Sequence, residues 1–345
     1  MAFLQVQNIR IAGISAGVPK HVENNLMNTS ISTEYSPVDF VRQTGVKERR
    51  IGNKTALDLC LPAAEQLITD LGWKKTDIDV LVFCTQMSDY FSPANSCIVQ
   101  GMLGLDKECF AMDINLGCSG WVYGISTVAS LLSKNGMKRA LFCCGDGKRR
   151  AQYDNPLFGF AGTVTALEYC DGAGSLNFHL GTDGKNYDAI IIPDGGSRNP
   201  INNQSFIPHL FEGKMIMPCE PHMKGMDVFG FGFSTAPKSV KSLISRFGLS
   251  LEEIDYFVFH QANMQMNNLI VKKLKIDTNK VPSCMSHFGN TSSASIPLTI
   301  VTQLREKNKS KNKLFLCCGF GVGLSWGTVT FKTDNEFIVS NLVEI

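Results

Sequence analysis

The 345-residue sequence carries little net charge and contains no long apolar run. No stretch approaches the roughly 18 consecutive apolar residues of a membrane-spanning helix. Lysine and arginine exceed aspartate and glutamate only narrowly, by 33 to 31. This balance gives no field strong enough to attract nucleic acid or a membrane surface. We therefore expect neither a membrane span nor a nucleic-acid partner.

The N-terminal residues also lack the features of a secretion signal. In the opening MAFLQVQNIRIAGIS, the polar residues Gln5, Gln7 and Arg10 interrupt any long apolar core. Such a segment is typical of a first strand.

The twelve cysteines do not have the pattern of a metal site or of a disulfide framework. No CxxC and no Cys/His pair has zinc-ligand spacing. Most cysteines lie inside apolar, strand-like runs such as LVFCT and LFCCG, where free cysteine behaves as a small apolar residue. We expect no metal, and a reducing, cytoplasmic compartment.

What the sequence does contain is an internal repeat. LGWKKTDIDVLVFCTQ is similar to FGLSLEEIDYFVFHQA, with Gly72 matching Gly248 and Asp79 matching Asp255. Further along, LFCCGDG in the first half is similar to LFLCCGFG in the second. Matches that occur in the same order in both halves predict a duplicated protein.

The periodicity of each half predicts strands that alternate with helices. This alternation favours a mainly parallel sheet covered on both faces. A stretch rich in glycine, proline and asparagine, 195–230, is expected to form loops over a pocket. The strands are expected near 79–84, 108–114, 139–145, 256–260 and 313–318, and the helices near 55–71, 93–103, 119–134, 235–247, 262–275 and 293–306.

Cys118 differs from the other cysteines because it follows a strand and opens a helix, in INLGCSGWVYG. Unpaired N–H groups and the positive end of the helix dipole meet at such a turn and favour a thiolate. A thiolate also needs a polarising partner. His260 follows a strand in VFHQAN, and Asn290 stands before a helix in FGNTSSASIP, at the position that matches Cys118 in the repeat. We expect all three to face one crevice, where open α/β sheets bind ligands.

Together these motifs resemble the ketoacyl synthase III branch of the thiolase superfamily. The resemblance rests on INLGCSGW, VFHQAN, FGNTSSASIP and CCGFGVGLSWG, with CDGAGSL and MKGMDVFGF in support. It implies an α/β protein with a thiolase-like, five-layered αβαβα fold of two duplicated halves. We place the half with the nucleophilic cysteine at 1–178 and the half with the histidine and asparagine at 179–345. The resemblance also implies a homodimer.

The resemblance further implies which residues react. Cys118, His260 and Asn290 would form a catalytic triad. The backbone amides of Cys118 and Val322 would form the oxyanion hole. In this scheme Cys118 takes an acyl group from a thioester, and a malonyl thioester then decarboxylates and attacks that acyl group.

The implied substrates are thioesters of coenzyme A or of an acyl carrier protein, and no other cofactor is expected. Met223, Phe229, Ala262 and Asn263 are expected to bind them.

The sequence departs from the better-known fatty-acid members where those members hold coenzyme A and the carrier. In those members the position of Asp39 is tryptophan and that of Gln43 is arginine. Met226 replaces their asparagine, and Gln265 replaces a further arginine. The basic residues Arg42, Arg49, Lys272 and Lys273 are candidates to supply the missing positive charge. The altered donor site favours a carrier protein over free coenzyme A.

Two other functions are compatible with a reactive cysteine. An acyltransferase on the same scaffold would move the acyl group to an amine or a hydroxyl, as in a pathway to an acylated sugar, lipid or secondary metabolite. A papain-like protease also has cysteine, histidine and asparagine in this order along the chain. However, the sequence lacks the CGSCW pattern, an upstream oxyanion glutamine and a secretion signal.

Overall fold

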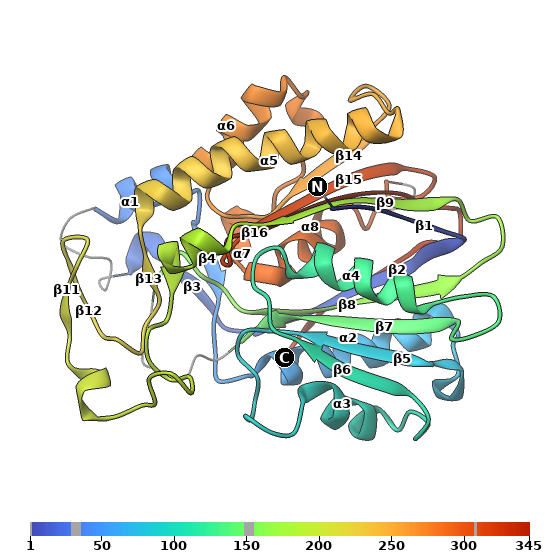
Figure 1. Ribbon diagram of the computed structural model, residues 1–345, viewed down its shortest axis with the longest axis horizontal. Helices are drawn as coiled ribbons and strands as arrows, with labels where there is room; N and C mark the ends of the chain where they lie inside the picture. The colour runs from blue at the N-terminus through green and yellow to red at the C-terminus, as the bar shows by residue number, and fades with distance from the viewer. Residues whose placement is uncertain (1, 29–35, 148–154, 307–308) are drawn as a thin grey trace.

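The computed structural model describes residues 2–28, 36–147, 155–306 and 309–345. Two large sheets run through the molecule (Figure 1). The six-stranded sheet has the order β17-β2-β8-β7-β5-β6, and the five-stranded sheet has the order β1-β9-β16-β15-β14. Their strands are β1 (Ala2–Gln7), β2 (Ile9–Val18), β5 (Val80–Cys84), β6 (Phe110–Ile114), β7 (Arg139–Asp146), β8 (Ala161–Tyr169), β9 (Ser175–Thr182), β14 (Tyr256–Phe259), β15 (Leu314–Gly321), β16 (Ser325–Lys332) and β17 (Ile338–Glu344).

The helices form three layers around these sheets. In Figure 1, α5 and α6 cover the outer face of the five-stranded sheet, and α2 and α3 cover the outer face of the other. Helices α4 and α8 lie between the two sheets. The helix bounds are α1 (Pro37–Thr44), α2 (Ala56–Leu71), α3 (Asn95–Leu103), α4 (Gly120–Leu131), α5 (Gly225–Phe247), α6 (Met264–Leu274), α7 (Met285–Phe288) and α8 (Ser295–Gln303). The expected αβαβα architecture is confirmed. The expectation of a mainly parallel sheet is wrong, because β8, β9 and β16 enter the two large sheets in antiparallel pairings.

Short strand pairs complete the fold around the layers. Each pair is antiparallel. They are β3 (Val22–Asn24) with β4 (Glu48–Arg50), β10 (Ile190–Ile191) with β13 (His222–Met223), and β11 (His209–Phe211) with β12 (Lys214–Ile216).

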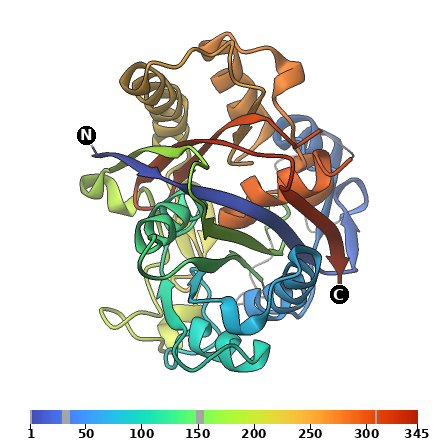
Figure 2. The same ribbon diagram turned by 90° about the vertical axis from the view of Figure 1, so that its right-hand side faces the viewer.

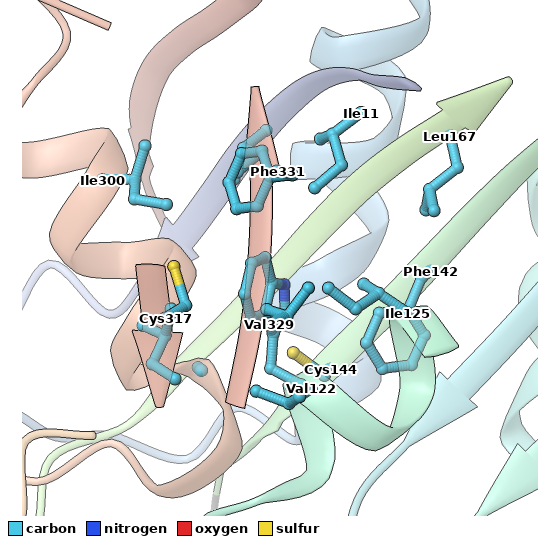
Figure 3. Close-up of a cluster of buried hydrophobic side chains, with 14 of the residues drawn as sticks. Ile11, Val122, Ile125, Phe142, Cys144, Leu167, Ile300, Cys317, Val329 and Phe331 are labelled. Atoms are coloured by element: carbon cyan, nitrogen blue, oxygen red, sulfur yellow. The ribbon is translucent and has the colours of Figure 1, made fainter. Parts of the chain in front are cut away.

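The largest apolar core lies between the two sheets. Val122 of α4 and Ile300 of α8 are both fully or almost fully buried there, with Phe142 of β7 and Val329 of β16 (Figure 3). Cys317 of β15 is 0% exposed in the same core, as expected for a cysteine in an apolar strand. Burial of this apolar surface fixes the two halves against each other.

The internal repeat is visible in the structure as two equivalent loops. Gly72 ends α2 and Gly248 ends α5, and both adopt a left-handed conformation, with φ of 63° and 64°. The Asp79 carboxylate then accepts a hydrogen bond from the backbone N–H of Arg139 at 3.0 Å. In the second half, Asp255 accepts one from Leu314 N–H at 2.8 Å. Each aspartate thus ties the start of one strand to the start of its neighbour.

The two sheets do not divide the chain at the expected boundary between residues 178 and 179. That boundary falls inside β9. In addition, β1 lies in the five-stranded sheet and β17 in the six-stranded one. Figure 2 shows β1 and β2 as one long ribbon that passes from one sheet to the other. Each end of the chain therefore adds an edge strand to the sheet that is formed mainly by the opposite half.

The expected strands and helices are confirmed within a few residues, except for the start of α5. This helix begins at Gly225, ten residues before the expected 235. Gly225, Gly230 and Gly232 disfavour a helix in the sequence. Burial of its apolar side chains against α6 and β15 outweighs that preference. No helix in the described ranges is long and apolar enough to cross a membrane.

Candidate active site

Cys118, His260 and Asn290 line one cavity of about 730 Å³. Cys118 follows β6 and lies directly before the start of α4. His260 follows β14 directly. Asn290 follows α7 and precedes α8. The structure therefore brings together all three residues that the sequence singled out.

The sulfur of Cys118 lies against the backbone of Gly321 at the end of β15. A Cβ atom at position 321 would lie 2.6 Å from Cys118 Cβ and 2.8 Å from its Sγ. Real Cβ atoms essentially never make contacts this short. Glycine at position 321 is thus required by the position of the reactive cysteine.

The thiol of Cys118 is held in its protonated form. Burial, followed by the negative charge of Asp146, raises the pKa of Cys118 to about 11. Hydrogen bonds from the Val322 backbone and the Ser292 side chain oppose this rise. The helix N-terminus was expected to favour a thiolate; burial and the charge of Asp146 act in the opposite direction here.

His260 is held in place by a serine on α8. Its Nδ1 shares a hydrogen bond with Ser295 Oγ at 2.8 Å, and the backbone N–H of Gln261 also donates to that oxygen at 3.3 Å. The imidazole is 2% exposed, and burial lowers the pKa of His260 to about 4, opposed by the Ser292 backbone. His260 is therefore neutral at physiological pH.

The side-chain amide of Asn290 is oriented by its own loop. Its Oδ1 accepts a hydrogen bond from Ser292 N–H at 2.9 Å, and its Nδ2 donates to the Ala262 carbonyl at 3.4 Å. An amide nitrogen carries two N–H groups, and a single carbonyl engages one of them. The remaining N–H can serve a bound substrate. Ser292 has a φ of 52°, a strained conformation for a residue other than glycine.

The expected oxyanion donors, Cys118 and Val322, are also adjacent. Val322 lines the cavity with Cys118. Hydrogen bonds from the backbones of Val322 and of Cys118 itself each act to lower the pKa of the thiol. Both backbone N–H groups therefore lie close to the sulfur, beside which the carbonyl oxygen of a thioester would become negative. Their role in the reaction stays a prediction.

Three of the four expected substrate-binding residues line the cavity: Met223, Ala262 and Asn263. Asn263 also caps α6, because its Oδ1 accepts from Met266 N–H at 2.8 Å. Phe229 packs instead in the apolar cluster around α5 and α6. Residues three apart share a helix face, and the cavity-facing positions of α5 are Val228 and Phe231. The sequence missed this because it did not predict a helix there.

The basic residues near the site differ in their roles. Arg49 is 1% exposed, and its guanidinium donates to Glu23 at 2.6 Å. The expectation that Arg49 supplies the missing positive charge to a substrate is wrong, because this side chain of β4 is buried and already paired with Glu23. Arg42 is exposed and paired with Asp39 at 2.6 Å. Lys273 lies over the ring of Phe233, 4.0 Å from its centroid.

The segment that covers the cavity begins earlier and ends earlier than the expected 195–230. Between β10 and α5 it contributes apolar and polar side chains to the wall, which periodicity did not reveal. Those that line the cavity are Ile190, Ile191, Ile192, Asp194, Ile201, Phe206, Cys219, Pro221 and Met223.

Comparisons with known proteins agree with this geometry. The family model of 3-oxoacyl-[acyl-carrier-protein] synthase III matches residues 112–184, and the model of its C-terminal part matches 244–333. The chain is 31% identical to β-ketoacyl-[acyl-carrier-protein] synthase III of Chlamydia caviae, over 95% of this chain and 98% of the relative. It is 30% identical to the Clostridium acetobutylicum protein of the same name, over 95% and 99%.

A solved structure from Burkholderia xenovorans LB400, described as a 3-oxoacyl-(acyl-carrier protein) synthase, has the same fold. It is 33% identical to this chain and superposes with a TM-score of 0.89, over 100% of this chain and 99% of the other. With matches of this length on both sequence and structure, the chain belongs to the β-ketoacyl-[acyl-carrier-protein] synthase III family.

Proposed function

We propose that the protein is a condensing acyltransferase that joins an acyl group to a malonyl thioester with loss of carbon dioxide. The observation that carries this proposal is a pair of uncharged donors, neutral His260 and the Asn290 amide, on the same cavity as Cys118. An enolate formed by decarboxylation needs hydrogen-bond donors at its oxygen. A papain-like protease is not supported by this family or by this fold.

In the first half-reaction, Cys118 Sγ attacks the carbonyl carbon of an acyl thioester. The thiol gives up its proton, the thioester C–S bond breaks, and the displaced thiol leaves with a proton. The backbone amides of Cys118 and Val322 hold the carbonyl oxygen as it becomes negative. Each such donor is worth roughly 3 kcal/mol of the barrier.

In the second half-reaction, His260 and Asn290 bind the thioester oxygen of the malonyl group. We assign Ser295 Oγ as the donor to His260 Nδ1, since that oxygen already accepts from Gln261 N–H. The imidazole proton then resides on Nε2, where it can donate to the substrate. Carbon dioxide leaves, and the resulting enolate carbon attacks the acyl carbonyl and releases Cys118.

Measurement of the two half-reactions separately tests this proposal. Intact-protein mass spectrometry after incubation with acyl thioesters reports loading, and labelled carbon dioxide from malonyl thioester reports condensation. We expect Cys118→Ala to abolish loading, and His260→Ala or Asn290→Ala to load but release little carbon dioxide. A wild-type protein that loads and then acylates an amine or hydroxyl, with no decarboxylation of any malonyl donor, would instead establish the alternative acyltransferase.

We also propose that the acyl donor is carried by an acyl carrier protein rather than by free coenzyme A. Asp39 lies on α1 with its carboxylate paired to Arg42 and to Ser36, so this position offers neither an aromatic ring nor a free cation to a nucleotide. The test is kcat/KM for the same acyl group on both donors, at low and high salt. Equal or better use of acyl-coenzyme A, with no salt dependence for the carrier, would contradict this preference.

The proposed oligomer is a homodimer that pairs the edges of the six-stranded sheets. Strand β6 forms one edge of that sheet, and Phe110 on it is 41% exposed. An unpaired edge with an exposed aromatic side chain is a template for a second copy. Light scattering after gel filtration should give a dimer, and Phe110→Lys should weaken it. A monomeric wild-type protein at micromolar concentration would rule this out.

The proposed reaction needs no cofactor beyond the thioester substrates. We also expect the protein to work in a reducing, cytoplasmic compartment, because its cysteines are present as free thiols.

A further inference from the structure

One carboxylate stands in an otherwise largely apolar part of the cavity wall. Asp194 lines the cavity together with Ile190, Ile201, Phe206 and Met223. A carboxylate next to apolar side chains loses hydration and needs hydrogen-bond donors in compensation. The reaction proposed above does not use this group.

Asp194 is held in a fixed position by buried neighbours. Its backbone N–H donates to the Pro218 carbonyl at 3.1 Å. Its Oδ2 accepts from Ser205 Oγ at 2.8 Å, and Ser205 is 0% exposed. The Ser205 oxygen in turn accepts from Asn202 N–H at 3.1 Å. Since that hydroxyl has a single proton, its orientation toward Asp194 is set by this chain of contacts.

The second carboxylate oxygen, Oδ1, receives no hydrogen bond from any residue in the described part of the chain. An ionised carboxylate can accept several hydrogen bonds, so Asp194 has unused capacity. Cys118 lines this same cavity, and an acyl chain attached to it would meet the apolar residues of the wall, which suit methylene groups.

We infer that Asp194 selects acyl groups that carry a hydrogen-bond donor, a hydroxyl or an ammonium, in the part of the chain remote from the thioester. This inference rests on the proposed loading of Cys118 and names the class of acyl group that is loaded. An unsubstituted chain would cover Asp194 and leave its Oδ1 without a hydrogen bond, whereas a donor on the chain would satisfy that oxygen.

The test compares loading of Cys118 with pantetheine thioesters of matched length that end in a methyl, a hydroxyl or an amine. We expect wild-type kcat/KM to favour the hydroxyl or amine chain by about tenfold, the effect of one hydrogen bond to a charged group. Asp194→Ala should remove this preference. Glu212→Ala removes a carboxylate from the exposed tip between β11 and β12 and should keep it. Asp194→Asn retains an acceptor oxygen and should weaken the amine preference more than the hydroxyl preference.

A binding measurement separates this inference from the proposed function. Thioether analogues of the same chains are titrated into Cys118→Ala by calorimetry, with and without Asp194→Ala. If Cys118 never loads any thioester, the proposed function fails, and the ratio of the dissociation constants still decides the role of Asp194. If wild-type protein loads or binds the methyl-terminated chain as well as the others, or if the preference survives in Asp194→Ala, the role assigned to Asp194 is wrong. Melting temperatures check that each variant is folded.

Discussion

Nδ1 of His260 lies 2.8 Å from the hydroxyl oxygen of Ser295, the first residue of α8. The two residues are 35 positions apart in the sequence, and nothing in the motif around either one indicates their contact. The bond sets the orientation of the imidazole, and with Ser295 as donor it also sets which ring nitrogen carries the proton. We therefore predict that Ser295 positions His260 for the proposed second half-reaction.

Replacement of Ser295 by alanine should slow condensation more than loading. Loss of one hydrogen bond that orients a catalytic group corresponds to about 1 kcal/mol, or roughly a fivefold to tenfold fall in carbon dioxide release. Acyl loading of Cys118 should change little. Ser293→Ala is the matched control, because Ser293 is buried two residues before Ser295 but forms no hydrogen bond with His260 in the described part of the chain. Equal losses in both half-reactions would argue against a role through His260.

The neutral state of His260 should be visible in the dependence of stability on pH. Burial lowers its pKa to about 4 from the ordinary 6.5, so on acidification the unfolded chain takes up the proton first. The contribution of His260 to stability is thus complete above pH 6.5 and declines as pH falls toward 4. The free energy of unfolding, measured with urea across this pH range, should fall less steeply with decreasing pH in His260→Gln than in wild-type. The control is His21→Gln, at an exposed position. It should leave unchanged the part of this pH dependence that comes from His260.

The negative charge of Asp146 should affect the reactivity of Cys118. Asp146 Oδ1 accepts hydrogen bonds from Thr85 Oγ1 at 2.9 Å and from Gln86 N–H at 3.2 Å, and an asparagine retains that acceptor. Asp146→Asn should lower the pKa of Cys118 from about 11 and speed its alkylation by iodoacetamide at pH 8, measured on the Cys118 peptide. Fast wild-type alkylation with a plateau below pH 8 would show that the thiol is not held protonated. Asp171→Asn, at an exposed position, is the control.

A methyl group at Gly321 should block the nucleophile. The added Cβ would come within 2.8 Å of Cys118 Sγ, and the overlap has to displace the sulfur or β15. We expect Gly321→Ala to reduce acyl loading by about a hundredfold, the upper range for steric overpacking. Gly230→Ala is the matched control, since a Cβ there would meet nothing within 4 Å. It should leave loading intact and stabilise α5 by about 0.5–1 kcal/mol. Normal loading by Gly321→Ala would contradict the close contact.

The two arginine–carboxylate pairs near α1 and β4 should differ greatly in their contribution to stability. Arg49 is buried, and besides Glu23 it donates to the Asn155 carbonyl at 2.9 Å. Its removal breaks this buried ion pair and takes one donor from the Asn155 carbonyl, so Arg49→Ala should lower the free energy of unfolding by about 3–5 kcal/mol. Arg42→Ala breaks an exposed pair with Asp39 and should cost less than about 1 kcal/mol. Similar losses for both variants in urea unfolding would refute this difference.

The local sequence around Cys118, His260 and Asn290 was enough to single out these residues as candidates, and all three line one cavity. Each residue follows or precedes a recognisable strand or helix, and these boundaries are encoded locally by glycine turns and apolar periodicity. The repeat then indicated that the three boundaries meet at one end of two similar sheets. The same kind of local signal identified the helix ends at Gly72 and Gly248.

The start of α5 and the position of Phe229 could not be predicted from the local sequence. Three glycines lower the helical preference of 225–232, and only packing against α6 and β15 compensates for them. The exchange of β1 and β17 between the sheets is equally invisible in the sequence, because strand pairing over hundreds of residues leaves no local pattern.

The sequence by itself determined the repeat, most of the helices, some of the strands, and the identity of the three groups at the cavity. These depend on side-chain type and on periods of a few residues. Only the tertiary structure decided their electrostatic state and surroundings: a protonated Cys118, a neutral His260 held by Ser295, a buried Arg49, and Asp194 in the cavity wall. Burial and the approach of charges from distant segments set these properties, and both exist only once the chain has folded.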